Sequence, residues 1–224
     1  MIVLIHGLGQ SPDSWKQTAA LLNIPQYNTC PDFTELLRGQ EATYPNLYTA
    51  FAAYCAKQNA PLDLCGLSLG GVLALNYAIE HPETVRSLVL IAAQYNMPKN
   101  LLRFQNLLFR FLPKSAFRQM GFEKTDMIQL CKTMLDLDFR ASLKQVSCPT
   151  LVVCGEKDTA NKAASTDLAS LLPNAKLRII SGAGHEVNTE APEQFAEALQ
   201  SFYHTRTPNP GSAPTPHSTL QTPN

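Results

Sequence analysis

The feature that most constrains this chain is an alternation of short apolar runs with stretches of helical spacing. Runs that are apolar along their whole length are typical of strands in a parallel sheet that is buried on both faces. We therefore predict an α/β chain with a doubly wound, mostly parallel sheet. The predicted strands are 2–5, 61–65, 87–92, 150–154 and 177–180, and the predicted helices are 13–22, 46–58, 69–80, 166–172 and 192–203.

A segment between the third and fourth predicted strands, about residues 94–147, has a different character. We predict that it forms a small helical cap over the carboxyl ends of the strands, where ligands bind in open α/β sheets. The alternative is an amphipathic helix lying on a membrane, but two interleaved arginines are too few for a strong electrostatic anchor. The apolar residues at helical spacing, which we expect to line the substrate site, are Leu101, Phe104, Leu108 and Phe111.

Residues 1–204, with the cap inserted in them, are expected to form one domain, because the length of the chain allows a single large core. From about residue 205 the composition changes to Pro, Thr, Ser and Asn, with almost no apolar side chains. Such a stretch cannot bury enough surface to offset its ordering entropy, so residues 205–224 are predicted to be a disordered tail.

Charge and targeting signals narrow the function classes. The chain has 18 Lys plus Arg and 18 Asp plus Glu, so no net field attracts nucleic acid or an anionic membrane. The apolar start stops at His6, well short of a secretory signal or of the roughly 20 residues of a membrane span. We expect a cytoplasmic protein with no nucleic-acid partner and no stable membrane anchor. The 6 cysteines form no CxxC pair and no cluster with histidine, which predicts reduced thiols and no metal site.

One serine stands in a pentapeptide with a mechanical meaning, Gly66-Leu67-Ser68-Leu69-Gly70. This G-x-S-x-G pattern follows a predicted strand and opens a predicted helix. A serine in such a tight turn has strained backbone angles, and the two glycines remove side chains that would collide. The pentapeptide alone fits a chance match in a glycine-containing turn as well as it fits a nucleophile. The strand before it and the helix after it indicate that Ser68 is a nucleophile.

A serine nucleophile needs a base to take its proton, and the chain has 5 histidines. His185 lies in a loop of small residues just past the last predicted strand, which can bring its imidazole over the strand ends. The other histidines lie beside the first strand, before Pro82, and in or near the tail. We predict that His185 is the general base.

The third member should be a buried carboxylate that holds the imidazole tautomer and balances the transient imidazolium. Asp158 follows the fourth predicted strand at its carboxyl end and is our choice. Glu156 is a competitor close by, and Asp136 and Asp138 in the predicted cap are weaker ones.

Two backbone N–H groups are predicted to bind the oxyanion of an acyl transfer. Leu69 directly follows Ser68 at a helix N-terminus, whose dipole and free donors suit a developing negative charge. The glycines in the loop after the first strand let the chain turn back beside Ser68 and present the N–H of Leu8. We interpret His6, at the base of that loop, as structural.

Taken in order, these motifs resemble the α/β-hydrolase superfamily, and most of all its small, helically capped bacterial esterases. The resemblance covers about residues 1–204, and the chain order nucleophile, acid, base is the one that this fold uses. It is specific for fold and triad but much less for substrate. Relatives cleave carboxylic esters, thioesters, lactones and carbon–carbon bonds of diketones, and some serve perhydrolysis or lyase chemistry. The matching segments are HGLG at 6–9, GLSLGG at 66–71, GEKD at 155–158, GAGH at 182–185 and EAPE at 190–193.

We therefore expect a serine hydrolase that cleaves a small carboxylic ester through an acyl-enzyme, with no metal or organic cofactor implied. A carbon–carbon bond hydrolase, a thioesterase or a lyase on the same residues is the alternative within the fold. A non-catalytic module that binds a small ligand is the alternative outside enzymology.

The chain departs from its relatives at the N-terminus. They usually have two antiparallel strands before the strand that leads to the His-Gly loop, and here that strand begins next to Met1. We expect those strands to be missing, which leaves a shortened sheet or an edge covered in another way. An open edge can pair with another chain, so a homodimer is one way to cover it and limited stability is one cost of leaving it open.

Overall fold

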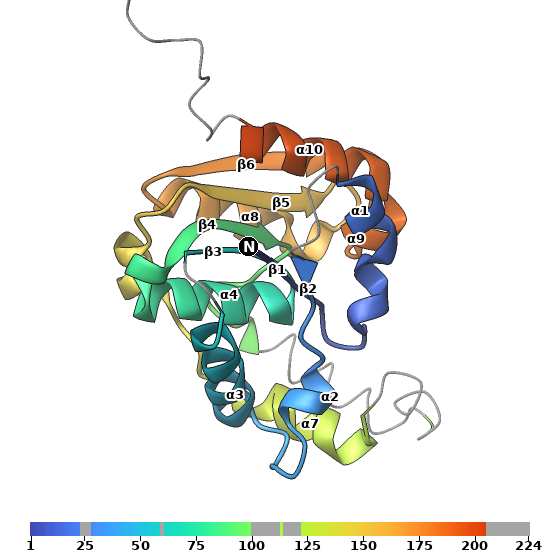
Figure 1. Ribbon diagram of the computed structural model, residues 1–224, viewed down its shortest axis with the longest axis vertical. Helices are drawn as coiled ribbons and strands as arrows, with labels where there is room; N and C mark the ends of the chain where they lie inside the picture. Colours follow the sequence, from blue (N-terminus) through green and yellow to red (C-terminus); the bar gives the residue numbers. More distant parts are fainter. Residues whose placement is uncertain (23–27, 59–60, 100–112, 114–121, 205–224) are drawn as a thin grey trace, which may run out of the picture.

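The computed structural model describes residues 1–22, 28–58, 61–99, 113 and 122–204. Within them, six strands form one sheet in the order β2-β1-β3-β4-β5-β6, and every pairing in it is parallel (Figure 1). The predicted α/β class and parallel sheet are therefore confirmed. The strands are β1 (Ile2–Ile5), β2 (Asn28–Thr29), β3 (Leu62–Leu67), β4 (Val85–Ile91), β5 (Thr150–Gly155) and β6 (Ala175–Ile180).

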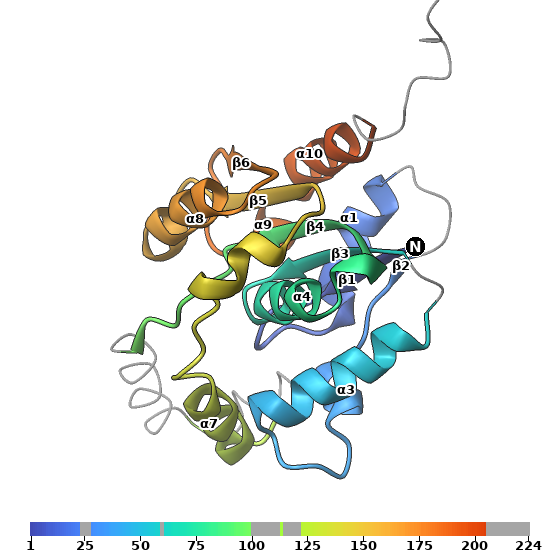
Figure 2. The same ribbon diagram turned by 90° about the vertical axis from the view of Figure 1, so that its left-hand side faces the viewer.

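Helices cover both faces of the sheet, as in a doubly wound fold (Figures 1 and 2). The helices α3 (Tyr44–Ala56), α4 (Leu69–Glu80) and α8 (Thr159–Leu171) contribute to the core on one face. The helices α1 (Lys16–Leu21), α9 (Val187–Glu190) and α10 (Pro192–His204) lie on the other. The remaining described segments are α2 (Phe33–Leu36), α7 (Lys124–Thr133) and the 3₁₀ turns η1 (Pro12–Trp15), η2 (Pro82–Thr84) and η3 (Arg140–Gln145).

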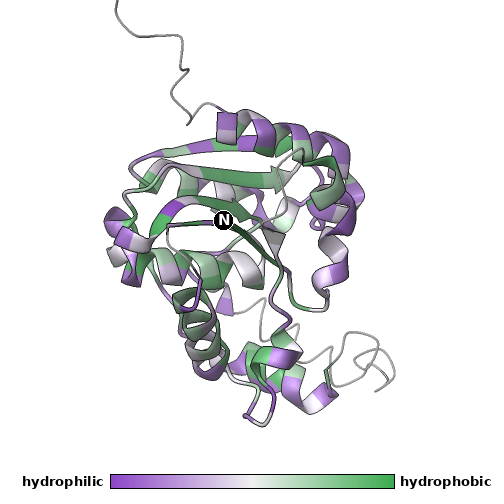
Figure 3. Cartoon of the chain, in the orientation of Figure 1, coloured by the Kyte–Doolittle hydropathy of each residue, from purple (hydrophilic) through white to green (hydrophobic). Residues whose placement is uncertain are grey.

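Alternation along the strands builds these two cores. In β1, Val3 and Ile5 enter one core while Ile2 and Leu4 enter the other, because successive side chains point to opposite faces of a strand. Apolar residues on both faces are what a parallel sheet between two helix layers requires. The strands at the centre of the molecule are accordingly hydrophobic in Figure 3, and hydrophilic residues gather on the outer helices.

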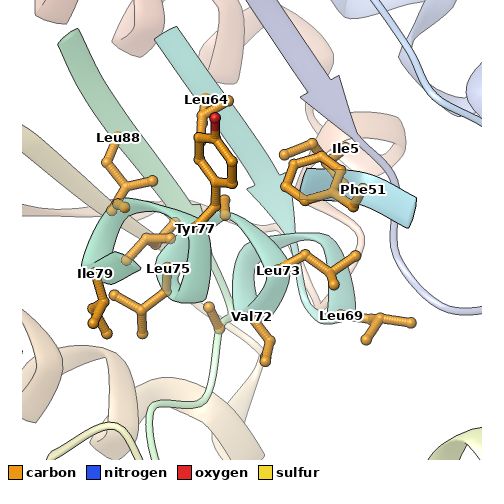
Figure 4. Close-up of a cluster of buried hydrophobic side chains, with 14 of the residues drawn as sticks. Ile5, Phe51, Leu64, Leu69, Val72, Leu73, Leu75, Tyr77, Ile79 and Leu88 are labelled. Atoms are coloured by element: carbon orange, nitrogen blue, oxygen red, sulfur yellow. The ribbon is translucent and has the colours of Figure 1, made fainter. Parts of the chain in front are cut away.

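Helix α4, which begins directly after Ser68, is buried around almost its whole circumference. It packs on β3 and β4 on its inner side and contacts α3 and η3 as well. Figure 4 shows this packing, with Leu73 and Tyr77 of α4 beside Leu64 of β3 and Phe51 of α3. A helix held from several sides gives its N-terminal turn a fixed position at the sheet edge.

Two local expectations need correction. Strand β2 was not predicted because it has only two residues and neither is apolar, yet it pairs with Ile2 and Val3. Therefore β1 is not the edge of the sheet; the edge is β2, whose shortness itself limits pairing with another chain. Helix α8 begins at Thr159 and not at the predicted residue 166. The prediction missed its first turns because they face solvent and show no apolar periodicity.

The predicted cap is only partly visible. Helix α7 lies within residues 94–147 and packs on α3, where the N–H of Tyr44 donates to Oγ1 of Thr133 at 2.8 Å. The expected substrate-lining residues Leu101, Phe104, Leu108 and Phe111 lie outside the described residues, as does the expected tail at 205–224. The domain and cap boundaries therefore stay predictions.

The cysteines Cys55, Cys65 and Cys131 are buried. Burial raises the pKa of Cys55 and of Cys131 to about 12, which keeps their thiols protonated at neutral pH.

Among the described helices, none is both long and apolar enough to cross a membrane.

Candidate active site

Ser68 occupies the turn between β3 and α4 with φ 51° and ψ −113°, so the strained turn predicted for this pentapeptide is present. Positive φ is uncommon for a residue with a side chain, and such strain concentrates at functional sites. Two backbone hydrogen bonds hold the conformation. The N–H of Ser68 donates to the carbonyl of Ile91 at 2.8 Å, and the N–H of Val72 donates to the carbonyl of Ser68 at 3.0 Å.

The glycines around Ser68 are required by close backbone contacts. A Cβ at Gly66 would lie 2.3 Å from the carbonyl oxygen of Gly70, and a Cβ at Gly70 would lie 2.3 Å from that of Ile5. Both distances are far below van der Waals contact, so any side chain at either position would push β1, β3 and α4 apart. The pattern thus encodes the geometry that presents the serine.

Asp158 and His185 form a direct pair. Nδ1 of His185 lies 2.8 Å from Oδ2 of Asp158, whose side chain is 5% exposed while that of His185 is 42% exposed. An ionised carboxylate can only accept, so the proton of this hydrogen bond resides on Nδ1. Nε2 of His185 is then the basic nitrogen of the ring, which is the tautomer that a general base needs.

The topology puts Ser68 at the same edge of the sheet as this pair, where the strands have their carboxyl ends. Ser68 follows β3, Asp158 follows β5 and His185 follows β6, and all three strands run in the same direction. Their carboxyl ends therefore meet at one edge, the usual place for a site in an open α/β sheet. The structure brings Asp158 and His185 into contact and places Ser68 at that edge.

Glu156, the nearest competitor for the acid, has a different task. Its exposed carboxylate accepts hydrogen bonds from the N–H of Gly182 at 2.8 Å and from the hydroxyl of Ser181 at 3.1 Å. These two donors hold the pKa of Glu156 below its usual value. In the predicted cap segment, Asp136 pairs with Lys99 at 2.7 Å and Asp138 accepts from the N–H of Arg140 at 2.9 Å.

A second carboxylate outside the pair also holds the histidine loop. Glu190 accepts from the N–H of Gly184 at 2.6 Å and from the N–H of Glu186 at 3.0 Å, the residues on either side of His185. With Glu156, it fixes the backbone of the loop at both ends. Sequence reasoning noted Glu190 only as part of the EAPE segment and did not predict that it binds this loop. Its position five residues after His185 was the one signal that could have suggested the contact.

The loop after β1 is a tight turn tied to α9. The N–H of Gln10 donates to the carbonyl of Gly7 at 3.1 Å, and Gly9 has φ 86°, as in the third position of a type II turn. Leu8, whose N–H we predict to bind the oxyanion, sits between them. The side chain of Gln10 exchanges hydrogen bonds with Asn188 in α9 at 3.3 and 3.4 Å. Sequence reasoning missed this amide pair.

His6 is buried beneath this loop. Its ring contacts Phe33 with 3.9 Å between centroids, Nδ1 lies 2.9 Å from the carbonyl of Gly7, and Nε2 accepts from the N–H of Phe33 at 3.4 Å. Burial lowers the pKa of His6. A neutral imidazole bonded to backbone on both sides fits the structural interpretation.

Two further amides adjoin the Asp158–His185 pair. Asn161, in the first turn of α8, contacts both residues, and Gln94, just past β4, contacts Asn161. Neither was singled out from the sequence: the predicted helix began after Asn161, and Gln94 was only the first residue of the predicted cap.

The fold agrees with comparisons to known proteins. Residues 2–198 match the family model described as the alpha/beta hydrolase family, and the chain belongs to that family. Among solved structures, the enol-lactonase from Burkholderia xenovorans LB400 superposes with a TM-score of 0.76 over 91% of this chain and 90% of its own, at 18% identity. At that identity the likeness concerns the fold alone.

Curated relatives narrow the class to hydrolases with esterase members. The chain is 26% identical to the pimeloyl-[acyl-carrier protein] methyl ester esterase of Aeromonas hydrophila, over 90% of this chain and 94% of that protein. It is 24% identical to the bifunctional biotin-biosynthesis protein of Cellvibrio japonicus over 92% of this chain, and spans 48% of that longer protein. The chain is thus an enzyme of the hydrolase class with esterase relatives.

Proposed function

We propose that this protein hydrolyses a small carboxylic ester through a Ser68–His185–Asp158 triad. Ser68 is the nucleophile, His185 the general base and then general acid, and Asp158 the buried carboxylate that orients the imidazole. The esterases among the relatives support this reaction, and the paired side chains of Asp158 and His185 support the roles.

The steps follow from these roles. Nε2 of His185 takes the proton of Ser68 as its Oγ attacks the ester carbonyl, and Asp158 balances the positive charge of the imidazolium. The N–H groups of Leu8 and Leu69 bind the oxyanion. The imidazolium then protonates the leaving alcohol, and water releases the acid from the acyl-enzyme by the same route.

The observation that carries the proposal is the backbone of Ser68. Ser68 has φ 51° between a buried strand and a buried helix, and strained backbone of this kind concentrates at functional sites. The turn also places Ser68 at the N-terminus of α4, where first-turn N–H groups have no partner within the helix and can bind a developing anion.

The test is a substrate panel with a matched variant. Nitrophenyl esters of graded acyl length, the corresponding thioesters and a diketone are assayed with the wild type, with Ser68→Ala and with Ser170→Ala. Ser170 is an exposed serine in α8 whose hydroxyl donates to the carbonyl of Asp167. We expect ester turnover that is lost in Ser68→Ala and retained in Ser170→Ala. Cleavage of the diketone without ester turnover would assign carbon–carbon hydrolysis instead.

The remaining expectations join this proposal as predictions. They are a small-molecule substrate bound under the cap residues Leu101, Phe104, Leu108 and Phe111, a cytoplasmic location and, as a further option, a homodimer. The substrate panel tests the first of these through its dependence on acyl length.

A further inference from the structure

Asn161 connects the Asp158–His185 pair to the rest of the sheet edge. Its Nδ2 lies 2.9 Å from both carboxylate oxygens of Asp158 and 3.2 Å from Nδ1 of His185. Since Nδ1 already donates to the carboxylate, it has no lone pair for a second donor. Nδ2 of Asn161 therefore donates to Asp158 alone, and the buried carboxylate is held from two directions.

Gln94 determines which way the amide of Asn161 points. Its Nε2 donates to Oδ1 of Asn161 at 2.7 Å, which turns Nδ2 toward Asp158. Gln94 follows an unusual backbone, because Ala92 has φ 49° and its N–H donates to the carbonyl of Val153 in β5 at 2.9 Å. A left-handed residue with a side chain is costly, so the turn at the end of β4 is held by its surroundings.

We propose that Asn161 and Gln94 are positioning residues for the acid of the triad: Gln94 orients the amide of Asn161, and Asn161 fixes the carboxylate of Asp158 against His185. The inference rests on the proposed function, because the pair acts through the residues that orient its general base. Asn161 lies in the first turn of α8 and Gln94 in the segment that follows β4, so their hydrogen bond also links these two parts of the chain.

The physical consequence concerns both geometry and charge. Without the donor from Asn161, the carboxylate of Asp158 can rotate, and it then holds the imidazole of His185 less firmly in the orientation that faces Ser68. A misplacement of about 1 Å can cost up to about 100-fold in rate, so kcat is expected to fall while KM changes little. The carboxylate also keeps more of its negative charge, which favours the imidazolium. The acid limb of the pH profile of kcat/KM is expected to move to higher pH.

The sharpest variant is Gln94→Glu, which is nearly isosteric. A carboxylate at this position can only accept, so it attracts Nδ2 of Asn161 and turns Oδ1 toward Asp158, oxygen against oxygen. We expect Gln94→Glu to lose more kcat than Gln94→Ala, although it is the smaller change in shape. In the Asn161→Ala background there is no amide to turn, and most of the difference between the two Gln94 variants should disappear.

A measurement without turnover keeps this inference separate from the proposed function. The pKa of His185 is followed by NMR of its imidazole in the wild type, Asn161→Ala and Gln94→Glu, with thermal unfolding as the check on folding. Asn174→Ala is the matched control, because this exposed asparagine donates to the carbonyl of Ser147, away from the pair. The titratable residues near Asp158 and His185 in the sequence are Cys154, Glu156, Lys157, Lys162 and Glu186, and no variant changes them. Gln94→Glu adds a carboxylate next to Asn161, so the test of the donor is the comparison of Asn161→Ala with Asn174→Ala.

The outcomes separate cleanly. We expect the pKa of His185 to rise in Asn161→Ala and to stay at its wild-type value in Asn174→Ala. An unchanged His185 pKa in Asn161→Ala, or a Gln94→Glu variant no worse than Gln94→Ala, overturns the positioning role. If the NMR changes appear but the wild type turns over no ester, the proposed function fails while the positioning pair stands.

Discussion

Oδ2 of Asp158 lies 2.8 Å from Nδ1 of His185, although 27 positions separate the two residues in the chain and they follow different strands. The pairing arises because β5 and β6 are parallel neighbours whose carboxyl ends deliver their loops to the same place. The carboxylate is almost fully buried and the imidazole is partly exposed, as the roles proposed for Asp158 and His185 require.

Replacing Asp158 with asparagine should lower kcat by roughly 10⁴-fold with little change in KM. The amide keeps the shape but can present N–H to Nδ1, which favours the wrong tautomer of the ring. Steady-state kinetics on the best ester of the panel measures the loss. Asp167→Asn, at an exposed position in the helix α8 that follows Asp158, is the control and should retain wild-type kinetics. A kcat for Asp158→Asn within tenfold of the wild type would rule out the assigned acid.

Gly155→Ala should displace the loop that carries His185. A Cβ at this position would lie 1.9 Å from the carbonyl oxygen of Gly184 and 2.6 Å from that of Ala183, in the loop that carries His185. The loop must shift, which we expect to cost about 1–3 kcal/mol of stability and most of kcat.

Gly39→Ala separates those two effects. A Cβ at Gly39 would meet nothing within 4 Å, but its φ of 75° strains any side chain. The variant should therefore lose about 1–2 kcal/mol of stability with kcat unchanged. Urea unfolding and ester kinetics are measured on both variants. Equal kcat values for Gly155→Ala and Gly39→Ala would show that Gly155 does not position the histidine loop.

Gln10→Ala should loosen the loop that carries Leu8. Gln10 accepts from the N–H of Gly7 at 3.2 Å and is paired with Asn188, so its side chain fixes the loop against α9. We expect kcat to fall by about tenfold or more and KM to change little, because a displaced oxyanion donor affects the transition state. Gln40→Ala is the control, since Gln40 is exposed and bonds only within its own turn in the described contacts. The prediction fails if both variants keep the same kcat.

His6 should make stability depend on pH on the acid side of neutrality. Burial lowers its pKa in the folded state below the ordinary histidine value of 6.5, so the unfolded chain binds its proton first as pH falls. The contribution of neutral His6 is fully present above pH 6.5 and is lost progressively as pH falls toward the folded-state pKa.

The measurement compares urea unfolding of the wild type and His6→Gln at several values of pH. Other groups titrate equally in both proteins, so the difference in the free energy of unfolding isolates His6. The advantage of the wild type over His6→Gln should shrink as pH falls below 6.5. An advantage that is constant from pH 7.5 to 5 would contradict the assignment of the buried neutral imidazole.

Sequence reasoning predicted the strands and helices whose burial is visible in the sequence as a pattern of apolar residues. β1 and α4 have the predicted bounds because apolar side chains define them from end to end. β2 was missed because it has only two residues and neither is apolar, and the start of α8 was missed because its first turns face solvent.

The candidate site also has residues that the sequence predicted and contacts that it did not. Asp158 and His185 could be predicted as partners because each ends a recognisable strand. Gln94 and Asn161 are 67 positions apart, and Gln10 and Asn188 are 178 apart. A single sequence carries no periodicity that would reveal such contacts between amide side chains, so they became visible only in the folded chain.

The central claim is that Ser68 is the nucleophile, and covalent labelling tests it most directly. The folded wild type, Ser68→Ala and Ser170→Ala are treated with an organophosphonate probe and analysed by intact and peptide mass spectrometry. The account predicts a single adduct, on the peptide that contains Ser68, in the wild type and in Ser170→Ala, and no adduct in Ser68→Ala. Folded wild-type protein that takes up no probe, or takes it up equally after Ser68→Ala, would contradict it.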